Sequence, residues 1–308
     1  AWAICCFVQR YHAPIPPTVK AVVRYAAKTI CVNLYGNDGL NMTSIQLVGF
    51  NQTAGKEVAD AAKQLKEENP SLSGYILDLR GNPGGLLTEA VNVSNVFIPK
   101  DEKIVEMRGR TPDSKNTFRT RTKPIDTELP VAVLINSMSA SASEIISAAL
   151  QDYGRAVIIG SKSTYGKGTV QNVIDLNNIV RSNENGDLGA LKLTTQKFYR
   201  INGGSTQLEG VKSDVVVPDK YSYIDIGERD QSNPLKWDKI SPAEYDYWDG
   251  YIDYDQTIAN STARMAANPQ INLIEENAKW IKSQQEETVI SLNYEAYKAE
   301  SEKDTEKS

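Results

Sequence analysis

Residues 131–150 read VAVLINSMSASASEIISAAL and decide the class of the fold. The first five residues are continuously apolar and rich in β-branched side chains, which is typical of a strand buried on both faces of a sheet. A stretch of small residues follows, and a helix is expected to run from it through residue 150. The sequence therefore predicts a buried strand, a tight turn and a helix in succession, which is the building unit of an α/β fold.

The same alternation of predicted strands and helices extends on both sides of this stretch. Further strands are expected at residues 45–50, 75–79 and 156–159, and helices at 56–68 and 88–96. Asn69-Pro70 ends the first of these helices, because the residue before a proline is disfavoured in the helical conformation. Strands and helices that alternate in this way predict a buried α/β sheet.

Composition limits the classes of function. The chain has 308 residues, of which 40% are hydrophobic and 24% charged, as in a soluble protein of about two domains. No run approaches the roughly 18–20 apolar residues of a transmembrane helix, so we expect no membrane span. The net charge of −5 argues against broad binding to nucleic acid.

The charge changes near residue 220. Residues 1–219 hold 24 Lys and Arg against 21 Asp and Glu, whereas residues 220–308 hold 10 against 18. The balance thus falls from +3 to −8, and we expect 220–308 to be an acidic, mostly helical C-terminal extension.

Residues 241–244 (SPAE) predict a helix start, with Ser as N-cap and Glu completing a capping box. Two apolar stripes predict later helices: Ile258, Thr262 and Met265, and then Ile271, Ile274, Ala278 and Ile281.

Residues 1–44 are expected to be an atypical leader without clear periodicity. No signal peptide is legible in them, since a basic start, an apolar run and a cleavage site are missing. They hold all three cysteines (Cys5, Cys6 and Cys31) and the one histidine, His12. A cysteine-based zinc site, a disulfide scaffold and a multi-histidine metal site are therefore not expected. A Ser-His-Asp mechanism would have to take its base from this segment.

Ser141 is the first candidate for chemistry. It lies between a buried strand and a helix start, where backbone N–H groups converge, and its neighbours Ala140 and Ala142 are small enough to admit a substrate. The alternative is that Ser139, Ser141 and Ser143 are ordinary N-cap residues, which on local sequence alone is the more frequent role.

Lys167 is the second candidate, in the sequence YGKGT at 165–169. The alternatives are an exposed lysine in a turn and a phosphate loop. The phosphate loop is rejected because the glycine spacing is wrong and Gly168 replaces the Ser or Thr that would hold Mg²⁺. Without histidine, serine and lysine are the available nucleophile and base, and such a lysine has to be buried and unpaired to be neutral. The turn GNPGG at 81–85 is a third, weaker candidate, since adjacent glycines can direct N–H groups at an anion.

Several sequence blocks in the same order resemble the tail-specific or C-terminal processing serine peptidases, family S41. The blocks are DLRGNPGG at 78–85, SASASE at 139–144, QDYGRA at 151–156, GKGTVQ at 166–171 and QKFYRINGGSTQ at 196–207. The resemblance covers residues 45–219, and VISLNY at 289–294 resembles the C-terminal extension of the larger periplasmic branch. It implies a crotonase/Clp-protease-like β-β-α superhelix for the core.

The resemblance also implies a set of site residues. Ser141 would be the nucleophile, Lys167 the base and Gln171 the residue that orients the base. The backbone N–H of Ala142, with that of either Gly84 or Gly85, would bind the oxyanion. Asp152, Glu144 and Thr164 match positions at which the family is sensitive to substitution.

The implied function is a serine endopeptidase of the bacterial periplasm or cell envelope. Its implied partners are partly unfolded or tagged proteins with apolar C-terminal tails and an adaptor lipoprotein, with no nucleic acid, metal or organic cofactor. Members of the family carry a PDZ domain before the core, and none is recognisable in residues 1–44. The alternatives are therefore an inactive or ungated relative that binds C-terminal tails, and, less well supported, acyl-CoA chemistry on the related crotonase fold.

Overall fold

The computed structural model describes residues 19–24, 30–37, 40–180, 186–250, 253–289, 292–295, 297–299 and 302. Within them the strands are β1 (Val19–Arg24), β2 (Ile30–Asn37), β3 (Leu40–Leu47), β4 (Leu72–Asp78), β5 (Lys103–Gly109), β6 (Asn116–Arg119), β7 (Val131–Ile135), β8 (Ala156–Gly160), β9 (Thr169–Asp175), β10 (Ala190–Tyr199) and β11 (Val215–Val216). The α-helices are α2 (Ala54–Glu68), α3 (Leu87–Ser94), α4 (Ala142–Asp152), α5 (Tyr254–Ala266) and α6 (Pro269–Glu286). Short 3₁₀ helices lie at Pro112–Ser114, Leu176–Asn178 and Glu228–Asp230.

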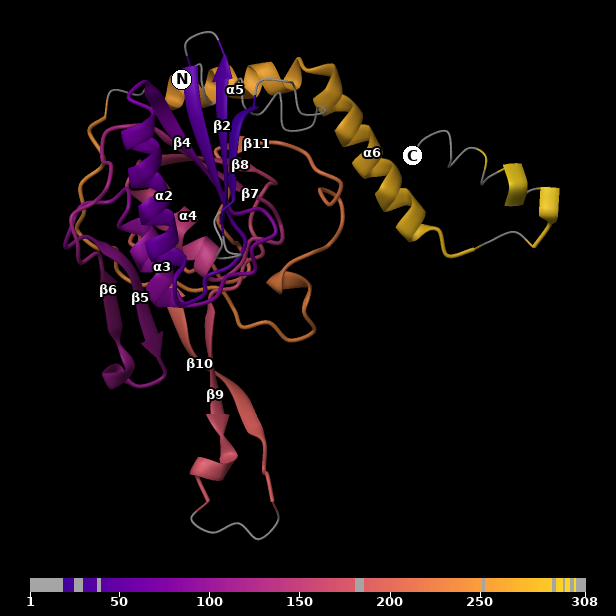
Figure 1. Cartoon of the computed structure of the whole chain (residues 1–308). Coiled ribbons are helices and arrows are strands. Elements are labelled where there is room, and N and C mark those ends of the chain that lie inside the picture. Colours follow the sequence, from indigo (N-terminus) through magenta and orange to yellow (C-terminus); the bar gives the residue numbers. More distant parts are fainter. Residues whose placement is uncertain are drawn as a thin grey trace.

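A seven-stranded sheet forms the centre of the molecule, in the order β1-β2-β3-β4-β7-β8-β11 (Figure 1). The strands from β3 to β11 run parallel, and β1, β2 and β3 are antiparallel. The predicted α/β class is therefore confirmed. The strand expected at 131–135 is β7, while the one expected at 45–50 begins earlier, at Leu40, and ends at Leu47.

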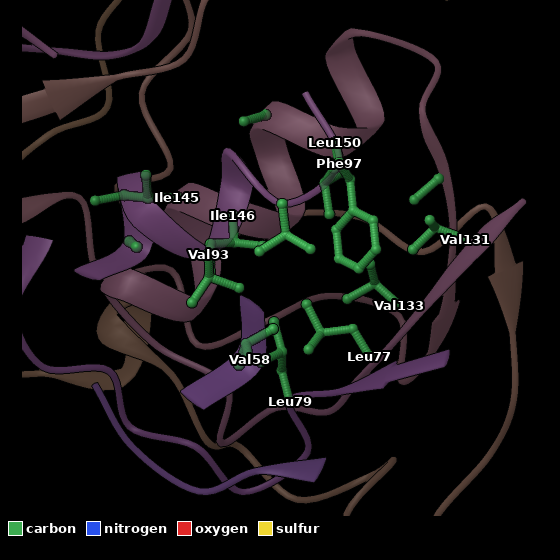
Figure 2. Packing of buried hydrophobic residues seen from close by; sticks show 14 of the residues in the cluster. Val58, Leu77, Leu79, Val93, Phe97, Val131, Val133, Ile145, Ile146 and Leu150 are labelled. Atoms are coloured by element: carbon green, nitrogen blue, oxygen red, sulfur yellow. The ribbon is translucent and has the colours of Figure 1, made fainter. Parts of the chain in front are cut away.

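Both faces of this sheet are buried at β4, β7 and β8, as the continuous apolar strands predict. In β7, Val131, Val133 and Ile135 face α2, α3 and α4, whereas Ala132 and Leu134 belong to the apolar cluster on the opposite face. Figure 2 shows the first of these layers, in which Val133 of the sheet lies next to Phe97, and Val93 of α3 and Ile146 of α4 belong to the same cluster.

The opposite face of the sheet is covered by the C-terminal extension. Met265 of α5 and Ile271 of α6 are buried in one cluster with sheet residues such as Ile76 and Ile159. The stripe predicted for α6 is confirmed by buried Ile271 and Ala278. Of the stripe predicted for α5, Met265 is buried and Ile258 packs against the same cluster, whereas Thr262 is exposed and Ser261 is buried instead.

The helix predicted to start at Ser241 is wrong. Residues 241–250 form no regular secondary structure, and two of their backbone bonds go to other segments: Ala243 N donates to Ile201 O (2.8 Å) and Trp248 N donates to Tyr153 O (2.8 Å). The rings of Tyr245 and Tyr153 pack edge to face at 5.5 Å. In this segment the long-range hydrogen bonds and ring packing replace the bonds of a helix. The capping signal is a weak local preference that tertiary packing overrides.

The described part of residues 1–44 is regular. β1, β2 and most of β3 pair in a meander at one edge of the main sheet, although the sequence showed no periodicity there. Cys5, Cys6 and His12 lie outside the described residues.

A second, antiparallel sheet has the order β6-β5-β10-β9. Its strands β9 and β10 form a long hairpin that projects from the body of the molecule (Figure 1). β9 begins directly after the loop that carries Lys167, so this hairpin holds one side of the candidate site. Within the described residues, no helix has the length and apolar character of a membrane span.

Candidate active site

Ser141 lies on the sharp turn that joins β7 to α4. It occupies the N-cap of α4 with φ 55° and ψ −110°. An N-cap residue usually has extended backbone angles, and a positive φ is uncommon for any residue other than glycine. Such strain, of about 1–3 kcal/mol, persists where the surroundings enforce it and clusters at functional sites. Hydrolases present a nucleophilic serine on a strained strand-to-helix turn of this kind.

The two neighbouring serines have structural partners. Ser139 Oγ donates to Leu79 O (2.8 Å) and Ser143 Oγ donates to Asn82 O (2.9 Å), and both side chains are buried. They fasten the turn to the segment that follows β4. Ser141 alone of the three is partly exposed, and it lines a pocket. The N-cap alternative therefore applies to position 141 alone, since Ser141 occupies the N-cap of α4, whereas Ser139 and Ser143 bond to distant carbonyls.

The pocket at Ser141, which we term the first pocket, has a volume of about 420 Å³. It brings together five of the residues expected from the sequence: Gly85, Ser141, Ala142, Lys167 and Gln171. Its apolar wall consists of Leu86, Leu87, Ile145, Val170 and Phe198. A polar cluster beside an apolar wall suits one side chain of a peptide held next to a reacting bond.

Lys167 lies across this pocket, two residues before β9. Its Nζ is 3.4 Å from Oε1 of Gln171, which lies in β9. No carboxylate of the described residues forms an ion pair with Lys167, as the sequence analysis required. The side chain is half-buried rather than buried, because it faces the open pocket.

Glu144 joins the Ser141 turn to the Lys167 loop. Its fully buried carboxylate accepts four hydrogen bonds. Oε2 accepts the backbone N–H groups of Ser141 (2.7 Å) and Lys167 (3.0 Å). Oε1 accepts the Thr164 hydroxyl (2.6 Å) and the backbone N–H of Gly166 (2.7 Å). One side chain thus fixes the backbone of both candidate catalytic residues, and Thr164 acts through it.

Burial raises the pKa of Glu144 to about 7. The four donors lower the pKa but do not outweigh the loss of solvation. The carboxylate form is the one that accepts all four bonds, so the cohesion of the two loops depends on ionisation near neutral pH.

The glycine turn at 81–85 packs against the Ser141 turn. Gly84 N donates to Oδ1 of buried Asn82 (2.9 Å), and Asn82 Nδ2 donates to Leu47 O (2.7 Å). The N–H groups of Gly85 and Ala142 have no hydrogen-bond partner among the described residues, and both residues line the first pocket. Of the two glycines that the sequence left open, Gly85 therefore has the available donor.

Replacement of Gly84 by alanine is expected to disrupt this turn. Gly84 has φ 99°, and an added Cβ would lie 2.7 Å from Ala140 O and 2.9 Å from Ser141 Cβ. We expect a loss of about 1–3 kcal/mol in the free energy of unfolding, together with reduced activity, because the clash displaces the Ser141 turn. Urea unfolding and peptide hydrolysis would measure both. Alanine at Gly81, where the space is open, has a similar φ and is the matched control. Equal losses in the two variants would contradict this explanation.

Asp152 is not in the pocket. It lies at the far end of α4, where it forms an ion pair with Arg200 (2.6 Å) and accepts a bond from Asn202 (2.9 Å). Arg200 directly follows β10, which pairs with β9 beside Lys167. Asp152 therefore joins the end of α4 to the end of the hairpin.

Gln207 is a functional candidate that the sequence analysis missed. It is fully buried, and its Oε1 accepts the N–H of Gly168, the residue after Lys167 (2.9 Å). Pro83 and Lys192 also line the first pocket without having been predicted. A buried glutamine gives no periodic signal, and its membership of the block at 196–207 was the one hint.

Comparisons with known proteins agree with the family resemblance of the sequence. A family model described as Peptidase family S41 matches residues 41–217, and the model for the C-terminal domain of tail specific protease matches residues 221–308. A tail-specific protease of Haemophilus influenzae is 40% identical over 276 residues, which are 83% of this chain and 39% of that protein. A carboxy-terminal-processing protease of Bartonella bacilliformis is 38% identical over 237 residues, 74% of this chain and 51% of that protein.

Among solved structures, mature CPAF superposes with a TM-score of 0.51 at 13% identity, over 66% of this chain and 52% of its own. This likeness concerns the fold alone. The chain spans about half or less of the length of the two curated relatives. The match over most of the α/β core nevertheless decides the classification: this chain belongs to peptidase family S41.

Proposed function

We propose that the chain is the catalytic part of a serine endopeptidase with a Ser141–Lys167 dyad. The observation that supports it best is the content of the first pocket. A strained, partly exposed serine lies there with a lysine that has no carboxylate partner among the described residues and with two unpaired N–H groups. These are a nucleophile, a base and an oxyanion site within one cavity.

In the proposed reaction Lys167, in its neutral form, takes the proton of Ser141 as Oγ attacks the scissile carbonyl carbon. The N–H groups of Ala142 and Gly85 donate to the oxyanion that forms. The protonated Lys167 then gives its proton to the leaving amine as the C–N bond breaks, which leaves an acyl group on Ser141. Water, deprotonated by Lys167, hydrolyses this ester and restores both residues. Gln171 orients the lysine, and Glu144 and Gln207 position its loop.

The proposed substrates are partly unfolded proteins with apolar C-terminal tails in the bacterial cell envelope. The names of the relatives, tail-specific and carboxy-terminal-processing protease, support this class. The apolar wall of the first pocket is compatible with an apolar side chain next to the cleaved bond.

Covalent labelling tests the proposal directly. The chain is treated with a fluorophosphonate, which phosphonylates activated serines, and the modified residue is located by mass spectrometry. We expect one adduct, on Ser141, and none in the Lys167→Ala variant, because the hydroxyl then lacks its base. An adduct on Ser139 or Ser143, or no adduct on the folded chain, would contradict the dyad. Retained binding of an apolar-tailed peptide without labelling would favour a binding module instead.

A further inference from the structure

A segment of the C-terminal extension crosses the loop that carries Lys167. We term residues 226–238 the strap. Glu228 N donates to Tyr165 O (2.9 Å), Gln231 Nε2 donates to the Tyr165 hydroxyl (2.8 Å), and Arg229 donates to Ser163 Oγ (3.1 Å). The first half of the strap is thus bonded to the residues just before Lys167.

The second half of the strap is bonded to the core on the other side of this loop. Trp237 Nε1 donates to Ser205 O (2.8 Å), and Lys197 forms an ion pair with Asp238 (3.1 Å). Buried Gln207 donates from Nε2 to Leu235 O (3.1 Å) and to Glu228 Oε1 (3.2 Å), while its Oε1 accepts Gly168 N. The strap is therefore bonded near both ends, and Gln207 connects its two halves to the residue that follows Lys167.

A second pocket, of about 560 Å³, lies between the strap and this loop. Its walls include Ile226, Pro234 and Leu235 of the strap, together with Met138 and Tyr165 of the core. It shares four lining residues with the first pocket: Pro83, Lys167, Thr169 and Gln171. The two pockets therefore form one groove that passes Lys167, with Ser141 in the first pocket.

We propose that the second pocket is a substrate subsite, formed by the strap, that binds an apolar side chain of the polypeptide at a distance from the cleaved bond. This inference rests on the proposed peptidase function and adds a specificity determinant to it. Met138 and Leu235 are 45% and 47% exposed in the free chain, and an apolar side chain between them would remove both from water.

The charges of the second pocket refine the expected ligand. Its charged lining residues are Lys167, at the junction with the first pocket, and Glu228, on the strap. An acidic side chain on the substrate would face Glu228, so the subsite should reject Asp and Glu. Exposed Gln231 and Asn233 at the same wall supply polar groups for peptide amides.

The test compares peptides that differ in one residue. In a Gly/Ser peptide with one cleavable bond, leucine, alanine or aspartate is moved through successive positions on each side of that bond. We expect one position, not adjacent to the bond, at which leucine raises kcat/KM about tenfold over alanine. Aspartate there should lower kcat/KM below the alanine value. In the Leu235→Ala variant the leucine-to-alanine ratio should fall toward one.

Leu273→Ala is the matched control, because Leu273 is 65% exposed on α6 and does not line the second pocket. It should keep the full leucine preference. A preference that Leu235→Ala leaves unchanged, or the absence of any preferred position outside the first pocket, would overturn the inference.

A separate readout keeps the subsite distinguishable from the chemistry. Turnover of an activated ester of N-acetyl-alanine, which is too short to reach the strap, tests the dyad alone. Binding of the leucine and alanine peptides is measured by fluorescence anisotropy in the Ser141→Ala background, with and without Leu235→Ala. Loss of the affinity difference on Leu235→Ala supports the subsite even if the chain does not cut, and an equal difference in both chains refutes it.

Discussion

Hydrolysis of an unfolded protein with an apolar tail should fall by about 10⁴-fold or more when Ser141 is replaced by alanine. The reaction then loses its nucleophile, whereas the N–H groups of Gly85 and Ala142 and the groove remain. Lys167→Ala should cause a loss of similar size, because residues that act as a unit are not additive. The measurement is kcat for a defined peptide, with circular dichroism to establish that each variant is folded.

Ser139→Ala is the matched control for Ser141→Ala. Ser139 lies two residues away, and its hydroxyl donates to Leu79 O in the interior. Its loss should lower the free energy of unfolding by about 1–3 kcal/mol while most of the activity remains. If Ser139→Ala abolished hydrolysis in a folded chain and Ser141→Ala did not, the assignment of the nucleophile would be wrong.

Glu144→Gln should reduce kcat by about 10²-fold in a chain that still folds. Four donors face the two oxygens of Glu144, and an amide presents its NH₂ group to one pair of them. Each buried donor that is left without an acceptor costs about 1–3 kcal/mol. The Ser141 and Lys167 loops are then no longer held together by one side chain. Displacement of catalytic groups by about 1 Å is enough for a loss of this size.

The same residue gives the chain a defined pH dependence. Since the pKa of Glu144 is raised to about 7, the carboxylate is protonated below that pH and the bond pattern weakens, so kcat should fall on acidification. The folded chain binds this proton more tightly than the unfolded one, for which the ordinary value is 4.5. The contribution of Glu144 to the free energy of unfolding is therefore complete below pH 4.5 and lost as the pH rises to about 7.

Glu144→Gln should remove the contribution of Glu144 to the pH dependence of kcat and of the free energy of unfolding. Kinetics and urea unfolding on each side of pH 7 would measure the two. Any acidic limb of the kcat profile that is identical in the two chains would have to come from another group.

Most of the core could be predicted from the local pattern of apolar residues. The continuous apolar residues 131–135 predicted a strand buried on both faces, and β7 is such a strand with the predicted bounds. The helix expected at Ser241 failed because its partners, Ile201 and Tyr153, are distant in the sequence. A local capping signal contains no information about such contacts.

Some features of the candidate site could likewise be predicted from the sequence, and others could not. Ser141, Lys167 and the glycine turn are candidates in the sequence, but local sequence favours an N-cap for Ser141, and the order of the blocks that resemble family S41 is what links the three. Gly84 and Gly85, by contrast, are chemically identical in the sequence, and the bond from Gly84 to Asn82 distinguishes them. The strap could not be predicted, since residues 226–238 have no periodicity and their role depends on buried Gln207.

The packing of α5 and α6 on the main sheet has a consequence for how this protein can be divided. The charge balance changes near residue 220, but Met265 and Ile271 share one core with Met42, Ile76 and Leu134. A fragment ending at residue 219 would leave that side of the sheet facing water, at about 1.5–3 kcal/mol for each large side chain uncovered. The change in charge near residue 220 therefore does not separate two independently folding units, and the core and the C-terminal extension should unfold as a single unit.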